Sequence, residues 1–251
     1  MEELQEAIQN AFPPITVSQS TLCRVLRNDL NYTRKKLTRQ VREALPAELN
    51  GYYHRLIPFY QYPQQLVFAD ETSKDARAAI RSMAWSKRGK MATVRLPAGR
   101  GKRLSAFASY STEGFLSWTL TSGTFDRHSF HRAVHSVILP YLQPWPLPRS
   151  ILILDNAKIH MYQELEDLVN SRGAILIYLP PYSPQLNPIE TGFGLLKRYI
   201  QKHCNLAFAS QPEYCLDIAF RECTKGANDT PLHQYYHAGY KYYRLDFNQR
   251  V

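Results

Sequence analysis

The chain has 251 residues, of which 44% are hydrophobic and 12% aromatic. This composition is typical of a protein with one sizeable hydrophobic core, and it excludes global disorder. No apolar run approaches the roughly 20 residues of a membrane helix, so we expect a soluble protein that does not enter a membrane. The N-terminus reads Met-Glu-Glu, unlike a secretion signal. The four cysteines form no CxxC pair, which favours a reducing compartment.

The charge of the chain points to a polyanionic partner. Thirty-one Lys and Arg against 21 Asp and Glu give a net charge of +10. Residues 76–112 contain no acidic residue, and Gly99 and Gly101 favour a loop there that follows a phosphate backbone. A solvated basic surface without a partner is the alternative. The residues of this segment that we expect to bind DNA are Arg88, Lys90, Arg100, Lys102 and Arg103.

The first 37 residues predict two short helices joined by a turn. Apolar residues at helical spacing run from Leu4 to Phe12 and stop at Pro13-Pro14, and Ser18 is a natural N-cap for a second helix. This pattern resembles a partial helix-turn-helix DNA-binding region, although a helical hairpin that only packs is the alternative. The side chains expected on DNA are Gln19, Ser20, Arg24, Arg27 and Asn28, followed by Arg34, Lys35 and Lys36. Residues 38–64 are expected to form a linker, either without regular structure or helical in part.

From residue 65 to residue 251 the pattern predicts a domain of α/β class. Buried strands are expected over residues 66–69, 104–110, 115–120, 151–154 and 174–179. Amphipathic helices are expected over residues 130–142 and 162–171, and a further helix begins at about residue 188. Antiparallel strands followed by alternating strands and helices imply a mixed sheet with helices on both faces.

Three carboxylates stand where such a sheet would place a site. Asp70 and Asp155 each follow four apolar residues, at the expected ends of two buried strands. Glu190 lies in the first turn of the helix that follows the prolines of SPQLNPIE. Taken singly, each Asp is as readily a turn or N-cap residue, but carboxylates converging from three elements favour a site for a hard divalent cation.

The motifs that contain these carboxylates resemble one family. LVFADET, WSKRGK, ILILDNAKIH and LPPYSPQLNPIE follow in order, with 34 residues between Asp155 and Glu190. This series is similar to the DDE transposases of the Tc-mariner superfamily, especially their fungal-type members, over nearly the whole chain. The resemblance implies a ribonuclease H-like fold with Asp70, Asp155 and Glu190 as catalytic metal ligands. It also implies two Mg²⁺ or Mn²⁺ ions and an in-line displacement at phosphorus without a covalent enzyme intermediate.

The resemblance implies an enzyme that cuts the ends of its own transposon and joins them to target DNA. Terminal inverted repeats, TA target sites, a homodimer and a nuclear location follow from the family alone. Lys158 and His160, in the DNAKIH motif, are expected near the site or the DNA, although an exposed lysine and a packed histidine are equally ordinary. The alternatives are a catalytically inactive or domesticated DNA-binding remnant and a ribonuclease H-like nuclease that does not transpose.

The chain also departs from the family pattern. Gln185 stands where family members often have Asp, and Gly192 and Gly194 are expected to weaken the helix that carries Glu190. The family usually has two helix-turn-helix units, and residues 2–30 resemble only the last two helices of the second. We therefore expect DNA binding that depends strongly on salt and discriminates little between sequences.

Overall fold

A computed structural model describes residues 2–33, 46–75, 86–91, 93, 103–204, 207–225 and 231–245. The chain divides into two compact units, Met1–Val41 and Arg42–Val251. No helix in the described ranges combines the length and the apolar character that crossing a bilayer requires.

The N-terminal unit contains the two predicted helices, α1 (Glu2–Ala11) and α2 (Gln19–Arg24). A π-helical turn, Val25–Asp29, extends α2. The predicted N-cap is confirmed, because the Ser18 side chain accepts a hydrogen bond from the backbone N–H of Thr21 at 3.2 Å. Leu22 is buried in this unit, whereas Phe12 and Leu30 are more than half exposed. Two short helices have little area to bury, so most of their apolar residues stay in contact with solvent.

The second unit is built on a five-stranded sheet that is mixed, as predicted, and has the strand order β3-β2-β1-β4-β5. Its strands are β1 (Leu66–Lys74), β2 (Leu104–Ser111), β3 (Gly114–Ser122), β4 (Ile151–Leu154) and β5 (Ile175–Tyr178). Strands β1, β2 and β3 pair antiparallel, and β4 and β5 extend the sheet in parallel from β1.

Strand β1 is longer than the sequence pattern predicts, and this changes the position of Asp70. Its parallel pairing with β4 ends at Ala69 opposite Leu154, but β1 continues to Lys74 paired with β2 alone. Asp70 therefore lies inside a strand, where the sequence predicts a strand end. Because β4 has already ended, Asp70 nevertheless stands at the point where the two parallel strands part.

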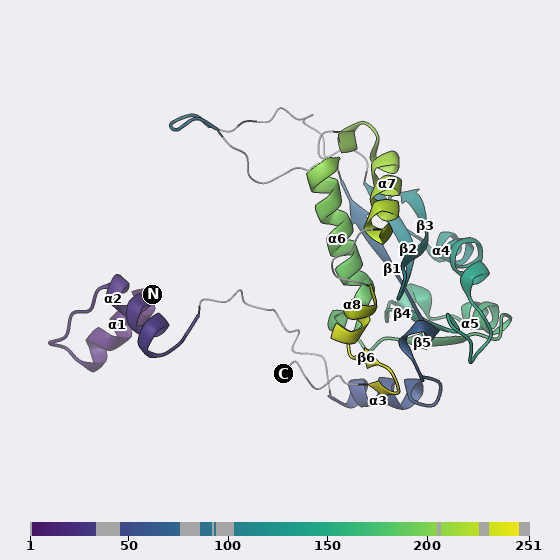
Figure 1. Ribbon diagram of the computed structural model, residues 1–251, viewed down its shortest axis with the longest axis horizontal. Helices are drawn as coiled ribbons and strands as arrows, with labels where there is room; N and C mark the ends of the chain where they lie inside the picture. The colour runs from purple at the N-terminus through teal and green to yellow at the C-terminus, as the bar shows by residue number, and fades with distance from the viewer. Residues whose placement is uncertain are drawn as a thin grey trace. The chain divides into compact units, whose positions relative to one another are not determined.

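Helices cover both faces of the sheet (Figure 1). The helices α6 (Pro188–His203), α7 (Pro212–Lys225) and α8 (Pro231–His237) pack on one face, and α4 (Arg127–Ala133) and α5 (Gln163–Asn170) pack on the other. The expected helix over residues 130–142 is α4 followed by a π-helical turn and a 3₁₀ turn.

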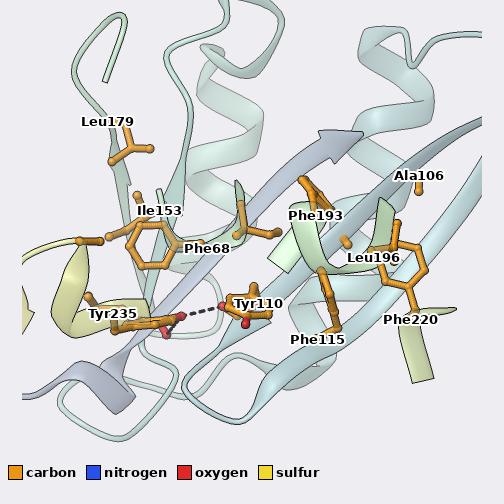
Figure 2. Close-up of a cluster of buried hydrophobic side chains, with 14 of the residues drawn as sticks. Phe68, Ala106, Tyr110, Phe115, Ile153, Leu179, Phe193, Leu196, Phe220 and Tyr235 are labelled. Carbon is orange, nitrogen blue, oxygen red and sulfur yellow. Dashed lines mark hydrogen bonds between the residues drawn. The ribbon is translucent and has the colours of Figure 1, made fainter. Parts of the chain in front are cut away.

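Aromatic side chains dominate the core on the α6 face (Figure 2). Phe115 packs edge-on against Phe220 of α7 and stacks with Phe193 of α6. The buried Tyr235 hydroxyl of α8 donates to the backbone carbonyl of Tyr110 at 2.8 Å, so this polar group is satisfied inside the core. The C-terminal helices thereby close the sheet face that carries α6.

The predicted linker, residues 38–64, does not extend to residue 64. Its second half contains α3 (Pro46–Leu56), whose Tyr52 and Leu56 are fully buried in the core of the second unit. Tyr52 also shares a hydrogen bond of 2.9 Å with Tyr240 in the small hairpin of β6 (Tyr240–Lys241) and β7 (Arg244–Leu245). Local patterns do not reveal this packing, because Tyr52 of α3 contacts Tyr240, which lies almost 200 positions later in the chain.

Gly192 has a packing role in α6 that the sequence analysis did not predict. The helix is continuous through both glycines. A Cβ atom at Gly192 would lie 3.0 Å from the ring of Tyr110 and 3.1 Å from that of Phe115, whereas one at Gly194 would meet nothing within 4 Å. Glycine at position 192 therefore allows α6 to approach the sheet closely, and this close packing holds the first turn of the helix near β1.

Candidate active site

A pocket of about 420 Å³ opens where β1 and β4 part. The segment between β5 and α6 forms one of its walls, and all three predicted carboxylates lie in its lining. The lining residues are Asp70, Asp155, Asn156, Ala157, Leu179, Pro180, Pro181, Tyr182, Ser183, Pro184 and Glu190.

Strand register and helix packing bring the carboxylates to this pocket. Since Ala69 and Leu154 are paired, the next residues, Asp70 and Asp155, emerge side by side at the end of the parallel ladder. Glu190 comes from the first turn of α6, which starts at Pro188. The neighbours Ile189 and Phe193 are buried, as the sequence predicts, so the opposite helix face leaves Glu190 exposed to the pocket.

Asp70 is held by two hydrogen bonds. The backbone N–H of Glu71 donates to Oδ1 at 2.6 Å, and Nδ2 of Asn187 donates to Oδ2 at 2.9 Å. Burial and then the negative charges of Asp155 and Glu190 raise the pKa of Asp70 to about 7. Such a carboxylate is strongly destabilised in its ionised form until positive charge enters the pocket.

Asp155 has a different environment, because a buried histidine lies against it. Nδ1 of His160 is 2.6 Å from Oδ1 of Asp155, and Nε2 lies 3.7 Å from Oε1 of Glu71. Burial opposes ionisation of Asp155, but His160 and the backbone N–H of Ala157 hold its pKa below the ordinary value. Burial disfavours the imidazolium, yet contact with Asp155 and Glu71 raises the pKa of His160 to about 9.

The donor set of the pocket fits a hard divalent cation. Its three carboxylates supply the oxygen ligands that Mg²⁺ and Mn²⁺ prefer, and the raised pKa of Asp70 records the repulsion that a cation would relieve. Within the described ranges, no group of three or more His, Cys, Asp or Glu residues is already gathered closely enough to hold a metal ion. The carboxylates share the pocket but do not form a closed cage.

Apart from His160, the remaining predicted site residues within the described ranges are exposed. Lys158 is exposed and does not line the pocket, whereas His160 is 3% exposed and contacts Asp155. The predicted DNA-binding residues Gln19, Ser20, Arg24, Arg27 and Asn28 are all exposed on the N-terminal unit. Arg88, Lys90 and Arg103 are exposed as well, and Arg103 donates to the Ser73 hydroxyl at 2.8 Å. Arg34, Lys35, Lys36, Arg100 and Lys102 lie outside the described residues.

Sequence analysis did not single out three residues of the site. Asn187 binds Asp70, Glu71 faces His160, and Tyr182 lines the pocket with 58% of its surface exposed. Strand alternation contained a signal for Glu71, because neighbours in a strand point to opposite faces and Glu71 must therefore lie on the face opposite Asp70. An Asn directly before the proline that opens a helix was the signal for Asn187.

Comparison with known proteins agrees with this geometry. The model of the DDE superfamily endonuclease family matches residues 65–213, which contain the sheet and all three carboxylates. A search of curated proteins found no match.

Three solved structures of Mos1 transposase complexes are similar in fold. A pre-cleavage Mos1 transpososome has 16% identity and a TM-score of 0.61, over 93% of this chain and 70% of that one. The Mos1 mariner paired-end complex with Mn has 17% identity and a TM-score of 0.59 over the same shares. The Mos1 strand transfer complex has 16% identity and a TM-score of 0.55, over 95% of this chain and 74% of that one. The ribonuclease H-like mixed sheet is thus confirmed, and the family match, which covers more than half of the chain, shows that it belongs to the DDE superfamily endonuclease family.

Proposed function

We propose that this protein is a transposase that cuts the ends of a transposon and joins them to target DNA. The observation that carries the proposal is the meeting of Asp70, Asp155 and Glu190 in one pocket, from three separate elements of a DDE endonuclease domain. The structural relatives support it, because their printed descriptions are of a pre-cleavage transpososome, a paired-end complex and a strand transfer complex.

Asp70, Asp155 and Glu190 would hold Mg²⁺ or Mn²⁺, and we propose two ions. When bound, the metal would activate the attacking water or 3′-hydroxyl and stabilise the leaving oxygen. The protein's own part is to bring three carboxylates together on rigid elements and to keep Asp155 ionised. The pocket is lined on one side by prolines, which restrict the backbone where the scissile phosphate would lie.

Basic and polar residues of both units would bind the DNA. Gln19, Arg24 and Asn28 are exposed on the N-terminal unit and have the side chains that read base edges and phosphates. Arg88, Lys90 and Arg103 would contact the backbone of the duplex. We further propose terminal inverted repeats as the bound ends, TA dinucleotides as targets, a homodimer that pairs two ends, and action in the nucleus.

Variants that lose DNA cleavage but keep DNA binding test this function. Asp70→Ala, Asp155→Ala and Glu190→Ala should each abolish nicking of a duplex that carries the transposon end, because each removes an oxygen ligand from the pocket. All three should keep DNA affinity within a few-fold of the unmodified chain, because the basic surfaces are untouched. Near-normal nicking by the Glu190 variant would remove the third carboxylate from the proposed site.

A further inference from the structure

His160 is enclosed between Glu71, a carboxylate of β1, and Asp155, which directly follows β4. It is 3% exposed, with Nδ1 2.6 Å from Asp155 and Nε2 3.7 Å from Glu71. Its ring stacks on Phe130 of α4, with 4.1 Å between ring centroids and 20° between planes. The Tyr178 hydroxyl of β5 donates to the His160 backbone carbonyl at 2.8 Å. Apart from Asp155, the residues that hold His160 do not line the pocket.

This arrangement leaves the two oxygens of Asp155 unequal. Oδ1 faces His160 and also accepts the backbone N–H of Ala157 at 3.3 Å. Rotation of a carboxylate about its terminal bond is otherwise only weakly restricted. With Oδ1 engaged on the protein side, Oδ2 is the oxygen left to bind a ligand in the pocket. The Asp155 side chain is 43% exposed, so packing alone does not set this orientation.

We propose that His160 is a positioning residue, which orients Asp155 for metal binding while Glu71 holds the far side of its ring. This inference rests on the proposed function, since it requires that Asp155 bind a cation. His160 and Glu71 do not line the pocket, and neither is among the predicted metal ligands. Groups that hold a metal-binding carboxylate in place typically change metal affinity by 10- to 100-fold when they are removed.

The contact also explains why a histidine is used at this position. The Nδ1–H is not aligned on Asp155 as in an ordinary hydrogen bond, so the 2.6 Å contact is an ion pair, which requires a proton on Nδ1 because a carboxylate supplies none. A phenylalanine would keep the stacking on Phe130 but remove the donor. An asparagine would place its amide nitrogen close to the position of Nδ1, whereas a glutamine would reach towards the position of Nε2. These substitutions separate the donor from the size of the side chain.

Titration of Mn²⁺ into the full chain by calorimetry, without DNA, tests the proposal. His160→Phe should weaken Mn²⁺ binding at least about tenfold. His160→Asn should stay within about threefold of the unmodified chain, and His160→Gln should resemble the Phe variant. As a matched control, His131→Phe changes a histidine of α4 that contacts Tyr162 at 3.1 Å and should leave Mn²⁺ affinity unchanged.

Each outcome bears on one claim. Unchanged Mn²⁺ affinity in His160→Phe would overturn the positioning role. Equal Mn²⁺ affinities of the His160→Asn and His160→Gln variants would overturn it as well. The Asn and Gln comparison remains decisive even if the Phe variant fails to fold, because both amides are polar and similar in size. Asp155→Asn identifies the origin of a failure: if it abolishes Mn²⁺ binding while His160→Phe does not, only the positioning role fails. If the unmodified chain binds no Mn²⁺, the metal chemistry of the proposed function fails together with this inference.

Discussion

Asn187 and Asp70, 117 positions apart in the chain, are joined by a hydrogen bond of 2.9 Å from the amide of one to a carboxylate oxygen of the other. Asn187 directly precedes α6, and its side chain makes no capping bond to that helix. The amide instead links the start of α6 to β1. Because Glu190 follows three residues later, this bond also sets the position of the third carboxylate relative to the first.

Loss of this link should weaken both the fold and the reaction. Asn187→Ala leaves the partly buried Asp70 with one fewer donor and should lower the free energy of unfolding by about 1 to 3 kcal/mol. It should also slow nicking of an end-containing duplex at limiting Mn²⁺, since Asp70 and Glu190 are no longer held together. Urea unfolding and single-turnover cleavage measure the two effects. Asn170→Ala, at an exposed position of α5, is the matched control, and equal cleavage by the two variants would contradict the prediction.

The raised pKa of Asp70 predicts how stability depends on pH in the absence of metal. In the folded chain this pKa is about 7, against an ordinary value of 3.8. Between about pH 4 and pH 7 the unfolded chain has lost this proton while the folded chain retains it. The free energy of unfolding should therefore fall as pH rises from about 4 to about 7. Above pH 7 the titration of Asp70 should cause no further change.

Urea unfolding in EDTA at several pH values measures this effect. Asp70→Asn removes the titrating group, so its stability should fall less between pH 4 and pH 7 than that of the unmodified chain. Millimolar Mn²⁺ at pH 7.5 should raise the melting temperature of the unmodified chain, because a ligand of the folded state stabilises it. Parallel pH curves for the two proteins would be inconsistent with a buried, repelled Asp70.

Replacing each of the two glycines of α6 by alanine should change the stability of the protein in opposite directions. Gly192→Ala introduces a Cβ atom about 3 Å from two core rings and should destabilise the protein by about 1 to 3 kcal/mol. Gly194→Ala meets open space and should stabilise it by up to about 1 kcal/mol through helix propensity. Thermal unfolding of both variants gives the comparison. A stabilised Gly192 variant would show that the close approach of α6 to the sheet is not required.

Salt dependence should separate phosphate contacts from base contacts. Combined replacement of Arg88, Lys90 and Arg103 by Ala should reduce the slope of log affinity against log salt by up to about 3, since each phosphate contact contributes about 0.9. Arg24→Ala should change this slope by no more than about 1. Titration of a fluorescent duplex at several salt concentrations measures the slope of log affinity against log salt. Comparing terminal-repeat and scrambled duplexes in the same titrations measures the preference for the transposon end. An unchanged slope in the triple variant would remove these three residues from the DNA-binding surface.

Much of this protein follows from local sequence. Short apolar runs that end at polar or turn residues identify the five strands, and the order of motifs around Asp70, Asp155 and Glu190 identifies the family and the residues that meet in the pocket. These features are local because strand alternation, helix spacing and proline positions act over a few residues. The basic surplus likewise predicts a polyanionic partner from composition alone.

Tertiary structure decided which residues support the three carboxylates. The antiparallel partner β2 extends β1 beyond Asp70, and the packing of Tyr52 and Leu56 joins α3 to the core. The contacts of Asn187 with Asp70 and of His160 with Asp155 and Glu71 arise only when strand register places Ala69 beside Leu154. The physical reason is that a shift of one residue in a strand moves every side chain to the other face. Motifs therefore identify the reacting carboxylates, whereas register and helix packing select the groups that hold them in place.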